Sequence, residues 1–135
     1  MIHVDTSFLV DLKREIARER PGPAFEVMES FDENTILGVS VFVVCELRAG
    51  AELFKQPERE HVTLDALLDG FVVTYPEERF ARTYARQVAI LARGRKTVEA
   101  FDLLIASAAL LDDAPLVTKN VKDFSRVPGL RVIGY

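Results

Sequence analysis

Short apolar runs alternate with amphipathic segments along the chain, and this alternation restricts the fold more than any other feature of the sequence. The runs are rich in β-prone residues, and the amphipathic segments place apolar side chains at helical spacing between proline and glycine breaks. Strands that alternate with helices form a mostly parallel sheet with helices on both faces. The sequence therefore predicts an α/β fold of three layers with a mostly parallel central sheet.

The element boundaries follow from the same pattern. Strands are expected at residues 2–4, 35–39, 71–74, 116–118 and 131–133, the last at a sheet edge. Helices are expected over residues 7–18, 23–33, 41–51, 64–69, 75–93 and 101–111. The start of the third helix stays open, because the β-branched residues of 41–44 favour a strand whereas the residues after them favour a helix.

Composition limits the class of protein. The chain has 135 residues, 49% of them hydrophobic, which fits one globular domain over residues 1–135. No apolar run approaches the roughly 20 residues of a membrane span, and Asp5 and Asp11 interrupt the region where a signal peptide would be apolar. We therefore expect a cytoplasmic protein. The single cysteine, Cys45, excludes an intrachain disulfide and is expected to be buried. The net charge of −4 argues against a general DNA-coating protein.

The first acidic residue comes directly after a short apolar run. Asp5 follows Ile2-His3-Val4, and Thr6 or Ser7 is placed to cap the helix that comes next. Such a turn puts Asp5 at the carboxyl end of a strand, where open α/β sheets bind their ligands. Taken alone, Asp5 fits equally well as a simple capping acid.

Three further acids stand in apolar or strand-end surroundings. Glu46 lies in a helix whose early residues are nearly all apolar, Asp102 begins the apolar segment FDLLIASAAL, and Asp123 follows the strand that ends at Thr118. Each has an ordinary alternative as an ion-pair partner, a helix N-terminal acid or a turn cap. With Asp5, however, they would converge at one edge of the sheet. Carboxylates packed together repel unless a cation neutralises them.

An all-oxygen ligand set favours Mg²⁺ or Mn²⁺ over zinc. Such an ion can hold a phosphodiester and lower the pKa of a bound water. The chain offers no Ser/His/Asp or Cys/His arrangement for nucleophilic catalysis and no glycine-rich phosphate loop. The four acids are therefore the candidate catalytic residues of this sequence.

Four segments carry a family resemblance. IHVDTSFLVDL, VCELRAG, FDLLIASAAL and LVTKNVKDFSRVPGLRV occur in this order and resemble the PIN-domain family, and within it the VapC-type toxin ribonucleases of bacterial toxin–antitoxin pairs. The resemblance covers essentially the whole chain. It implies a PIN-like fold and a Mg²⁺- or Mn²⁺-dependent endoribonuclease that leaves a 5′-phosphate and a 3′-hydroxyl. It puts Asp5, Glu46 and Asp102 at three acidic metal-site positions.

The fourth metal-site position departs from the family pattern. Many members have an acid two residues after the strand-end threonine, where this chain has Asn120; Asp123, three residues further on, is the alternative carboxylate. The resemblance also implies that Thr6 and Thr118 orient carboxylates or waters through their hydroxyls, with Asn120 as a further supporting group. We therefore predict four catalytic, metal-binding acids: Asp5, Glu46, Asp102 and Asp123.

Basic residues that border the inferred site are candidate contacts for RNA phosphates: Arg93, Arg95, Lys119 and Lys122. The alternative for such residues is ordinary surface charge. Surface charge is also the interpretation for KREIARER at residues 13–20, the polar end of the first helix.

The resemblance implies two partners besides RNA, a VapB-like antitoxin and a second copy of the chain. Several apolar residues of 41–68 are expected to exceed what a small sheet covers and to form a dimer interface and an antitoxin groove, namely Leu53, Phe54, Leu64, Leu67 and Leu68. Packing into the chain's own core is the alternative.

Two rival functions remain. The first is a PIN fold that binds RNA or protein with weak or no catalysis, which the departure at Asn120 keeps open. The second is a receiver-like regulatory domain. It needs a paired acid beside the first strand and a lysine after the last, and this chain matches that pattern poorly.

Overall fold

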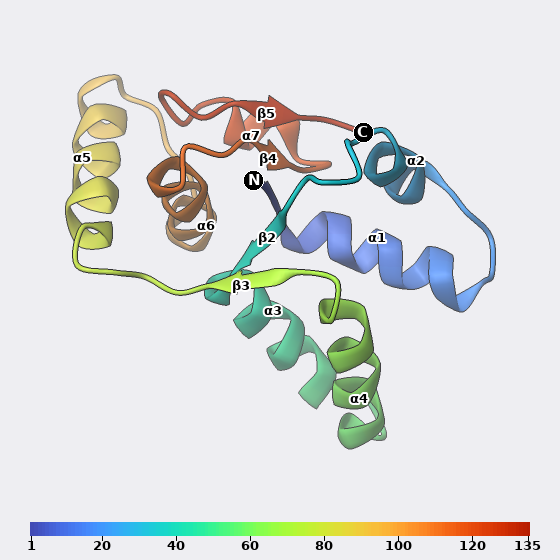
Figure 1. The fold of residues 1–135 in the computed structure, drawn as a ribbon. Coiled ribbons are helices and arrows are strands. Elements are labelled where there is room, and N and C mark those ends of the chain that lie inside the picture. Colours follow the sequence, from blue (N-terminus) through green and yellow to red (C-terminus); the bar gives the residue numbers. More distant parts are fainter.

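A five-stranded parallel sheet forms the centre of the computed structural model, which describes residues 1–135 (Figure 1). The strand order is β3-β2-β1-β4-β5, and every neighbouring pair is parallel. The strands are β1 Ile2–Val4, β2 Leu37–Ser40, β3 Val72–Thr74, β4 Leu116–Val117 and β5 Val132–Ile133. The carboxyl ends of all strands therefore lie along one edge of the sheet.

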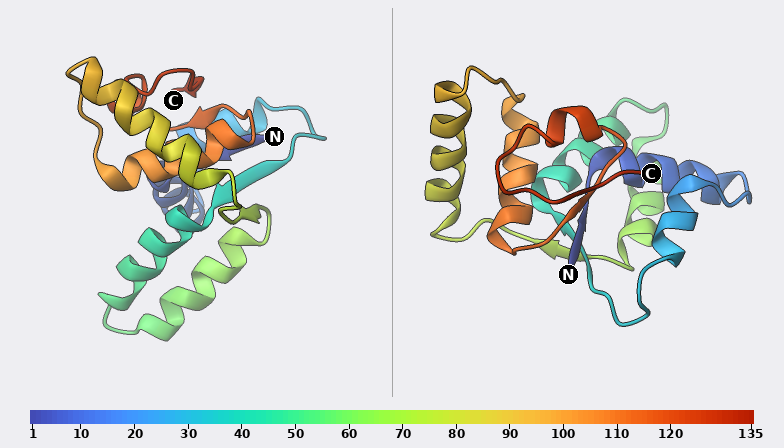
Figure 2. Two further views of the ribbon diagram at one scale, coloured as in Figure 1. Left: turned by 90° about the vertical axis from the view of Figure 1, so that its left-hand side faces the viewer. Right: turned by 90° about the horizontal axis from the view of Figure 1, so that it is seen from above.

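Seven helices connect the strands: α1 Thr6–Ala17, α2 Pro23–Glu29, α3 Val41–Glu52, α4 Pro57–Leu68, α5 Phe80–Arg93, α6 Ala100–Leu111 and α7 Val121–Phe124. Crossovers between parallel strands are right-handed, so the connections from β1 to β2 and from β2 to β3 run over one face, and those after β3 run over the other. The views agree, because α1 and α2 lie across the sheet from α5 and α6 (Figure 1 and Figure 2). The predicted three-layer α/β fold is confirmed.

The core is centred on the two middle strands. Val4, Leu116 and Val117 have no exposed surface, and α1 packs Phe8 and Leu9 against them from one side. From the other face, α6 contributes apolar and small buried residues: Leu103, Ile105, Ala106 and Ala109. None of the helices combines the length and the hydropathy that a membrane-spanning segment requires.

The open boundary at residues 41–44 is decided in favour of a helix. α3 begins at Val41, because the Ser40 hydroxyl accepts a hydrogen bond from the Val43 N–H (3.4 Å) and caps the helix. Val43 and Leu47 occupy the buried face of α3. Cys45 lies on another face and is exposed, so the expectation that it is buried is wrong.

The long helix α5 begins later than the sequence predicts, at Phe80 and not at residue 75. Residues 75–79 are exposed, whereas Phe80 is buried and its ring centroid lies 5.3 Å from that of Phe42. Most helix stability in proteins comes from packing of an apolar face. The helix therefore starts where its first buried side chain is available.

Some apolar side chains of residues 41–68 that are predicted to be uncovered pack against the chain's own core. Leu64 is buried, so the prediction is wrong for this residue, whereas Leu67 and Leu68 are partly buried against the core and Leu67 also lines a surface groove. Leu53 and Phe54 do stand out from the surface, with 89% and 51% of their area exposed. Leu53 and Phe54 therefore remain as exposed apolar residues.

The helix α1 ends in a left-handed residue that is not glycine. Glu19 has φ 50°, its N–H donates to the Ile16 carbonyl oxygen (3.0 Å), and the Arg20 N–H donates to the Glu15 carbonyl oxygen (3.1 Å). This is the hydrogen-bond pattern of a Schellman motif, in which glycine is the favoured left-handed residue. Glu19 therefore holds a conformation that costs free energy for any residue with a Cβ.

This strain gives a prediction for stability. Glu19→Gly should raise the free energy of unfolding by about 0.5–1 kcal/mol, because glycine adopts a positive φ without steric cost. Urea unfolding followed by circular dichroism measures the change. Ala17→Gly, two residues earlier and in ordinary helical geometry, is the control and should lower stability by a similar amount. A Glu19→Gly variant less stable than the parent would contradict the argument.

Candidate active site

Asp5 is held at the carboxyl edge of the sheet by the register of β1 and β4. Val4 pairs with Val117, so the residues that follow them, Asp5 and Thr118, lie side by side. The Thr118 hydroxyl donates to Asp5 Oδ2 (2.5 Å), and the Asp5 N–H donates to the Val117 carbonyl oxygen (3.2 Å). Two residues that are 113 positions apart in sequence thus form one unit.

The other carboxylate oxygen of Asp5 caps α1. Oδ1 accepts hydrogen bonds from the Phe8 N–H (3.0 Å) and the Ser7 hydroxyl (2.7 Å), so Asp5, and not Thr6 or Ser7, is the N-cap. Each carboxylate oxygen offers about two acceptor positions, which leaves one on Oδ2 for a ligand. Burial raises the pKa of Asp5, and the hydrogen bonds from Thr118, Phe8 and Ser7 act in the opposite direction. Asp5 therefore caps the helix and still keeps a free acceptor.

Glu46 reaches the same edge from the second turn of α3. The hydroxyl of Thr6, the first residue of α1, donates to Glu46 Oε1 (2.6 Å). Glu46 Oε2 makes no hydrogen bond within the chain. Thr6 thus directs the Glu46 carboxylate, as Thr118 directs that of Asp5.

Asp102 lies in the first turn of α6, half-buried, and its carboxylate accepts no side-chain or backbone hydrogen bond. Burial, together with the negative charges of Glu99, Glu46, Asp5 and Asp123, raises the pKa of Asp102 to about 6. The structure therefore brings the four predicted acids near one another, although they come from four separate segments.

Asp123 is positioned by the short turn after β4. The Asn120 N–H donates to the Thr118 hydroxyl (2.9 Å), and the Asn120 side-chain amide donates to Asp123 Oδ2 (3.0 Å). Arg126 Nη1 lies 3.5 Å from Asp123 Oδ1, and Phe124 is packed inward with 2% of its area exposed. Asn120 thus contacts Asp123 directly and links it to the Thr118–Asp5 pair.

Two residues of this edge escape the sequence prediction. Glu99 is the N-cap residue of α6 and is the neighbour whose charge affects Asp102 most. Ser7 donates to Asp5 and accepts a hydrogen bond from the Lys119 N–H (3.1 Å), which ties α1 to the turn after β4. The spacing of three residues between Glu99 and Asp102 is the only sequence signal for Glu99.

The acids do not form a closed metal cage. No group of three or more His, Cys, Asp or Glu side chains stands close enough to hold a metal ion. Charged carboxylates at closer spacing would repel each other unless a cation lay between them. The donor chemistry nevertheless fits a hard ion: the free acceptors at this edge are oxygens, most of them of carboxylates, and Mg²⁺ commonly uses one or two carboxylates and keeps several waters.

The four candidate phosphate contacts differ in their surroundings. Lys119 Nζ pairs with Asp11 Oδ2 (2.7 Å), and its backbone is bonded to Ser7 beside the acids. The exposed side chains of Arg93, Arg95 and Lys122 make no hydrogen bond or ion pair. Only Lys119 is therefore linked to the acidic edge by an observed contact.

Comparison with known proteins identifies the family. The PIN domain family profile matches residues 2–130. Ribonuclease VapC19 of Mycobacterium tuberculosis is 30% identical over 128 residues, 95% of each chain, and ribonuclease VapC2 of Rickettsia felis is 29% identical over 112 residues, 83% of this chain and 84% of the relative. The chain belongs to the PIN domain family and is of the VapC type.

Solved structures give the same assignment. VapBC2 of Rickettsia felis, bound to a DNA fragment from its promoter, superposes with a TM-score of 0.87 at 27% identity, covering 100% of this chain and 99% of the other. VapBC-1 of nontypeable Haemophilus influenzae superposes with a TM-score of 0.86 at 28% identity, covering 99% and 98%. The fold of this chain therefore extends over the whole of both relatives.

The raised pKa of Asp102 predicts how stability depends on pH. The folded pKa of about 6 lies above the ordinary value of 3.8 for an aspartate carboxyl. The metal-free protein should therefore be destabilised by ionised Asp102 above pH 6 and regain that stability as the pH falls towards 4. Asp102→Asn should raise the free energy of unfolding at pH 7.5 by about 1 kcal/mol, a value reduced for the partial exposure of the carboxyl.

Thermal unfolding in EDTA between pH 4 and pH 8 tests this expectation. Glu33→Gln is a matched control, because the Glu33 side chain is exposed and makes no hydrogen bond or ion pair, and it should leave the pH profile unchanged. An Asp102→Asn variant whose pH profile coincides with that of the parent would show that the Asp102 carboxyl is not under electrostatic strain.

Proposed function

We propose that this chain is a Mg²⁺- or Mn²⁺-dependent endoribonuclease and the toxin of a VapBC-type pair, with residues 1–135 acting as one PIN domain in the cytoplasm. The observation that carries the proposal is the convergence of Asp5, Glu46, Asp102 and Asp123 at one sheet edge, where their charges raise the pKa of Asp102. The ribonuclease names of the VapC relatives support RNA as the substrate.

The free acceptors define which residues would hold the ion. They are Asp5 Oδ2, Glu46 Oε2, the Asp102 carboxylate and Asp123 Oδ1, the last shared with Arg126 at 3.5 Å. A bound divalent ion would lower the pKa of a water molecule and offset negative charge on the phosphodiester. It would also relieve the repulsion among the carboxylates.

The supporting residues fix the acids before any ligand arrives. Thr118 and Ser7 hold the Asp5 carboxylate in one orientation, and Thr6 holds that of Glu46. Asn120 does the same for Asp123. Residues that orient ligands in this way typically contribute about 10- to 100-fold to metal affinity or activity. The hydroxyls and the amide therefore preorganise the site, and the acids carry the charge.

Basic residues around this edge are available for the phosphates of RNA. Lys119 is tied to the site through Ser7, and Lys122 lies next to Asp123 on α7. Arg93 and Arg95 belong to the exposed end of α5 and the turn after it, which leads towards α6 and Asp102. We therefore retain all four as phosphate contacts.

The partners of this protein follow from its relatives and from its exposed apolar surface. The similar structures are VapBC complexes, which supports a VapB-like antitoxin as partner. A groove of 410 Å³ between α1 and α4, lined by Ile16, Val62 and Leu67 among others, offers an apolar surface for a segment of that kind. Leu53 and Phe54, exposed at the end of α3, support a homodimer.

A binding module without catalysis is the second candidate function. The observation that favours it is the absence of three ligand side chains close enough to hold an ion, together with Asn120 at the position where many members have an acid. Cleavage assays separate the two functions.

The central test is the removal of one carboxylate. Asp5→Asn and Asp102→Asn should each abolish Mg²⁺-dependent cleavage of RNA, because each removes a charge that a divalent ion requires. Both variants should remain folded by circular dichroism. Cleavage is measured on a labelled pool of structured RNAs, with EDTA as the metal-free control and Glu33→Gln as the carboxylate control. Full activity in either variant would refute the assignment.

A second test separates Asp123 from Asn120. Asp123→Asn should weaken Mg²⁺ affinity or turnover by about 10-fold or more, whereas Asn120→Ala should do less, because an amide neutralises no charge. The cleavage rate of both variants is titrated against Mg²⁺. If Asn120→Ala is the more damaging change, the metal-site role belongs to Asn120, and Asp123 is a turn residue.

A further inference from the structure

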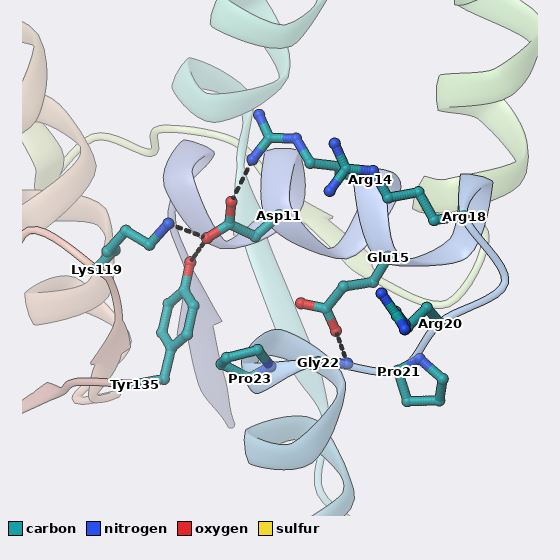
Figure 3. A pocket seen from close by; sticks show the side chains of 10 residues that line it. All are labelled: Asp11, Arg14, Glu15, Arg18, Arg20, Pro21, Gly22, Pro23, Lys119 and Tyr135. Carbon is teal, nitrogen blue, oxygen red and sulfur yellow. Dashed lines mark hydrogen bonds and ion pairs between the residues drawn. The ribbon is translucent and has the colours of Figure 1, made fainter.

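A polar cleft of 340 Å³ opens beside the acidic edge, between the carboxyl-terminal half of α1, the turn that leads to α2, and the side chains of Lys119 and Tyr135 (Figure 3). Its walls carry four cations and two carboxylates: Arg14, Arg18, Arg20, Lys119, Asp11 and Glu15. Most of these belong to residues 13–20, whose charges the sequence suggests are ordinary surface charge. The structure instead gathers them around one cavity.

Both carboxylates are occupied by contacts within the chain. Asp11 accepts a hydrogen bond from the Tyr135 hydroxyl (2.9 Å) and pairs with Lys119 Nζ (2.7 Å) and Arg14 Nη1 (3.1 Å). Glu15 points into the turn, where Oε1 accepts from the Gly22 N–H (2.7 Å) and the Phe25 N–H (3.0 Å), and Oε2 from the Ala24 N–H (3.0 Å) (Figure 3). Asp11 is thus paired with two cations, whereas Glu15 bonds neutral N–H groups and keeps its charge, so four positive and two negative side chains line the cleft.

Arg18 and Arg20 are the unpaired charges of the cleft. Neither guanidinium has a carboxylate within 4.0 Å, although the chain as a whole carries a net charge of −4. A guanidinium presents a rigid fork of donors that matches the oxygens of a phosphate. The cleft therefore holds free capacity for an anion.

The cleft is also built to keep its shape. The Schellman motif at Glu19 fixes the backbone of Arg20, and the three N–H bonds to Glu15 fix the turn that follows. Gly22 leaves room for the Glu15 carboxylate, because a Cβ at this position would lie 2.9 Å from Glu15 Cδ and would displace it. A site whose backbone is held in this way loses little entropy when a ligand binds.

Lys119 and Ser7 link the cleft to the acidic edge through hydrogen bonds. The Lys119 N–H donates to the Ser7 hydroxyl, which donates to Asp5, while Lys119 Nζ reaches Asp11 inside the cleft. Asp11, Arg14 and Arg18 follow one another on one face of the α1 segment at spacings of three and four residues, and Asp5 lies at the amino end of the same helix. At about 1.5 Å of rise per residue, the cleft extends roughly 9–20 Å along α1 from Asp5.

We propose that this cleft binds the phosphates of the RNA strand on one side of the scissile bond, with Arg18 and Arg20 as the principal contacts. The inference rests on the proposed ribonuclease function. The lining favours a nucleic acid over a protein segment, because no Leu, Ile, Val, Met or Phe side chain faces the cleft to receive an apolar anchor. Lys119 lies between the cleft and the acidic edge, so it contacts the RNA between the phosphates in the cleft and the phosphate at the acids.

Binding of a 12-nucleotide single-stranded RNA tests the proposal. Fluorescence anisotropy is measured with the full chain carrying Asp5→Asn, in Mg²⁺, as a function of salt. Adding Arg18→Ala and Arg20→Ala together should weaken binding about 10-fold and reduce the slope of log affinity against log salt by about 1.4, or about 0.7 for each lost phosphate contact. Arg59→Ala with Arg82→Ala is the control, because it removes two exposed, unpaired arginines from α4 and α5 and should change affinity by about 2-fold or less.

Several outcomes would overturn the proposal. The first is equal RNA affinity in the Arg18/Arg20 variant and the control. The second is a loss of affinity that appears only for inorganic phosphate and not for RNA. The third is a poly-glutamate peptide that binds as tightly as RNA and depends on the same arginines. If the double alanine variant does not fold, Arg18→Gln with Arg20→Gln takes its place, because glutamine keeps most of the side-chain length.

The proposed ribonuclease function can fail independently of the cleft. If the parent chain cleaves no RNA but binds it through Arg18 and Arg20, the cleft stands and the nuclease assignment does not.

Discussion

The hydrogen bond from Thr118 to Asp5 joins the two ends of the chain at the point on which the candidate site depends. It exists because β1 and β4 pair in parallel with Val4 opposite Val117, which places the next residue of each strand at the same height. From that contact, Ser7 and Asn120 extend the network to α1 and to the turn that carries Asp123. A shift of one residue in this register would turn Asp5 to the other face of the sheet and dissolve the network.

The carboxylates gathered at this edge of the sheet lower the stability of the metal-free fold. Asp102 accepts no hydrogen bond, and burial with the charges of Glu99, Glu46, Asp5 and Asp123 raises its pKa to about 6. A chain selected only for stability would replace such a residue with a neutral one. Repulsion retained at one place is typical of functional sites, where a ligand supplies the missing charge.

The surface around α1 divides into regions of different chemistry. The start of α1 borders the acids, its carboxyl-terminal half lines a cleft with two unpaired arginines, and its exposed Ile16 faces an apolar groove against α4. Helical periodicity makes this possible, because side chains separated by three or four residues share a face and their neighbours point elsewhere. One helix thus serves a candidate catalytic edge, a proposed strand-binding cleft and a surface for a protein partner.

Local sequence determined the α/β class and most strands and helices, because strand and helix periodicity are properties of neighbouring residues. It also indicated four candidate acids, through the placement of Asp5 after an apolar run and through the family resemblance. Local sequence could not determine where α5 starts, because that depends on the packing of Phe80. It could not determine the exposure of Cys45 either, because that depends on which face of α3 is buried. Glu99 and the arginines at residues 18 and 20 look like surface charge until distant segments are brought beside them. Only the tertiary structure decided these points, because burial, the charge environment of a carboxyl and the lining of a cleft are set by residues far apart in the chain.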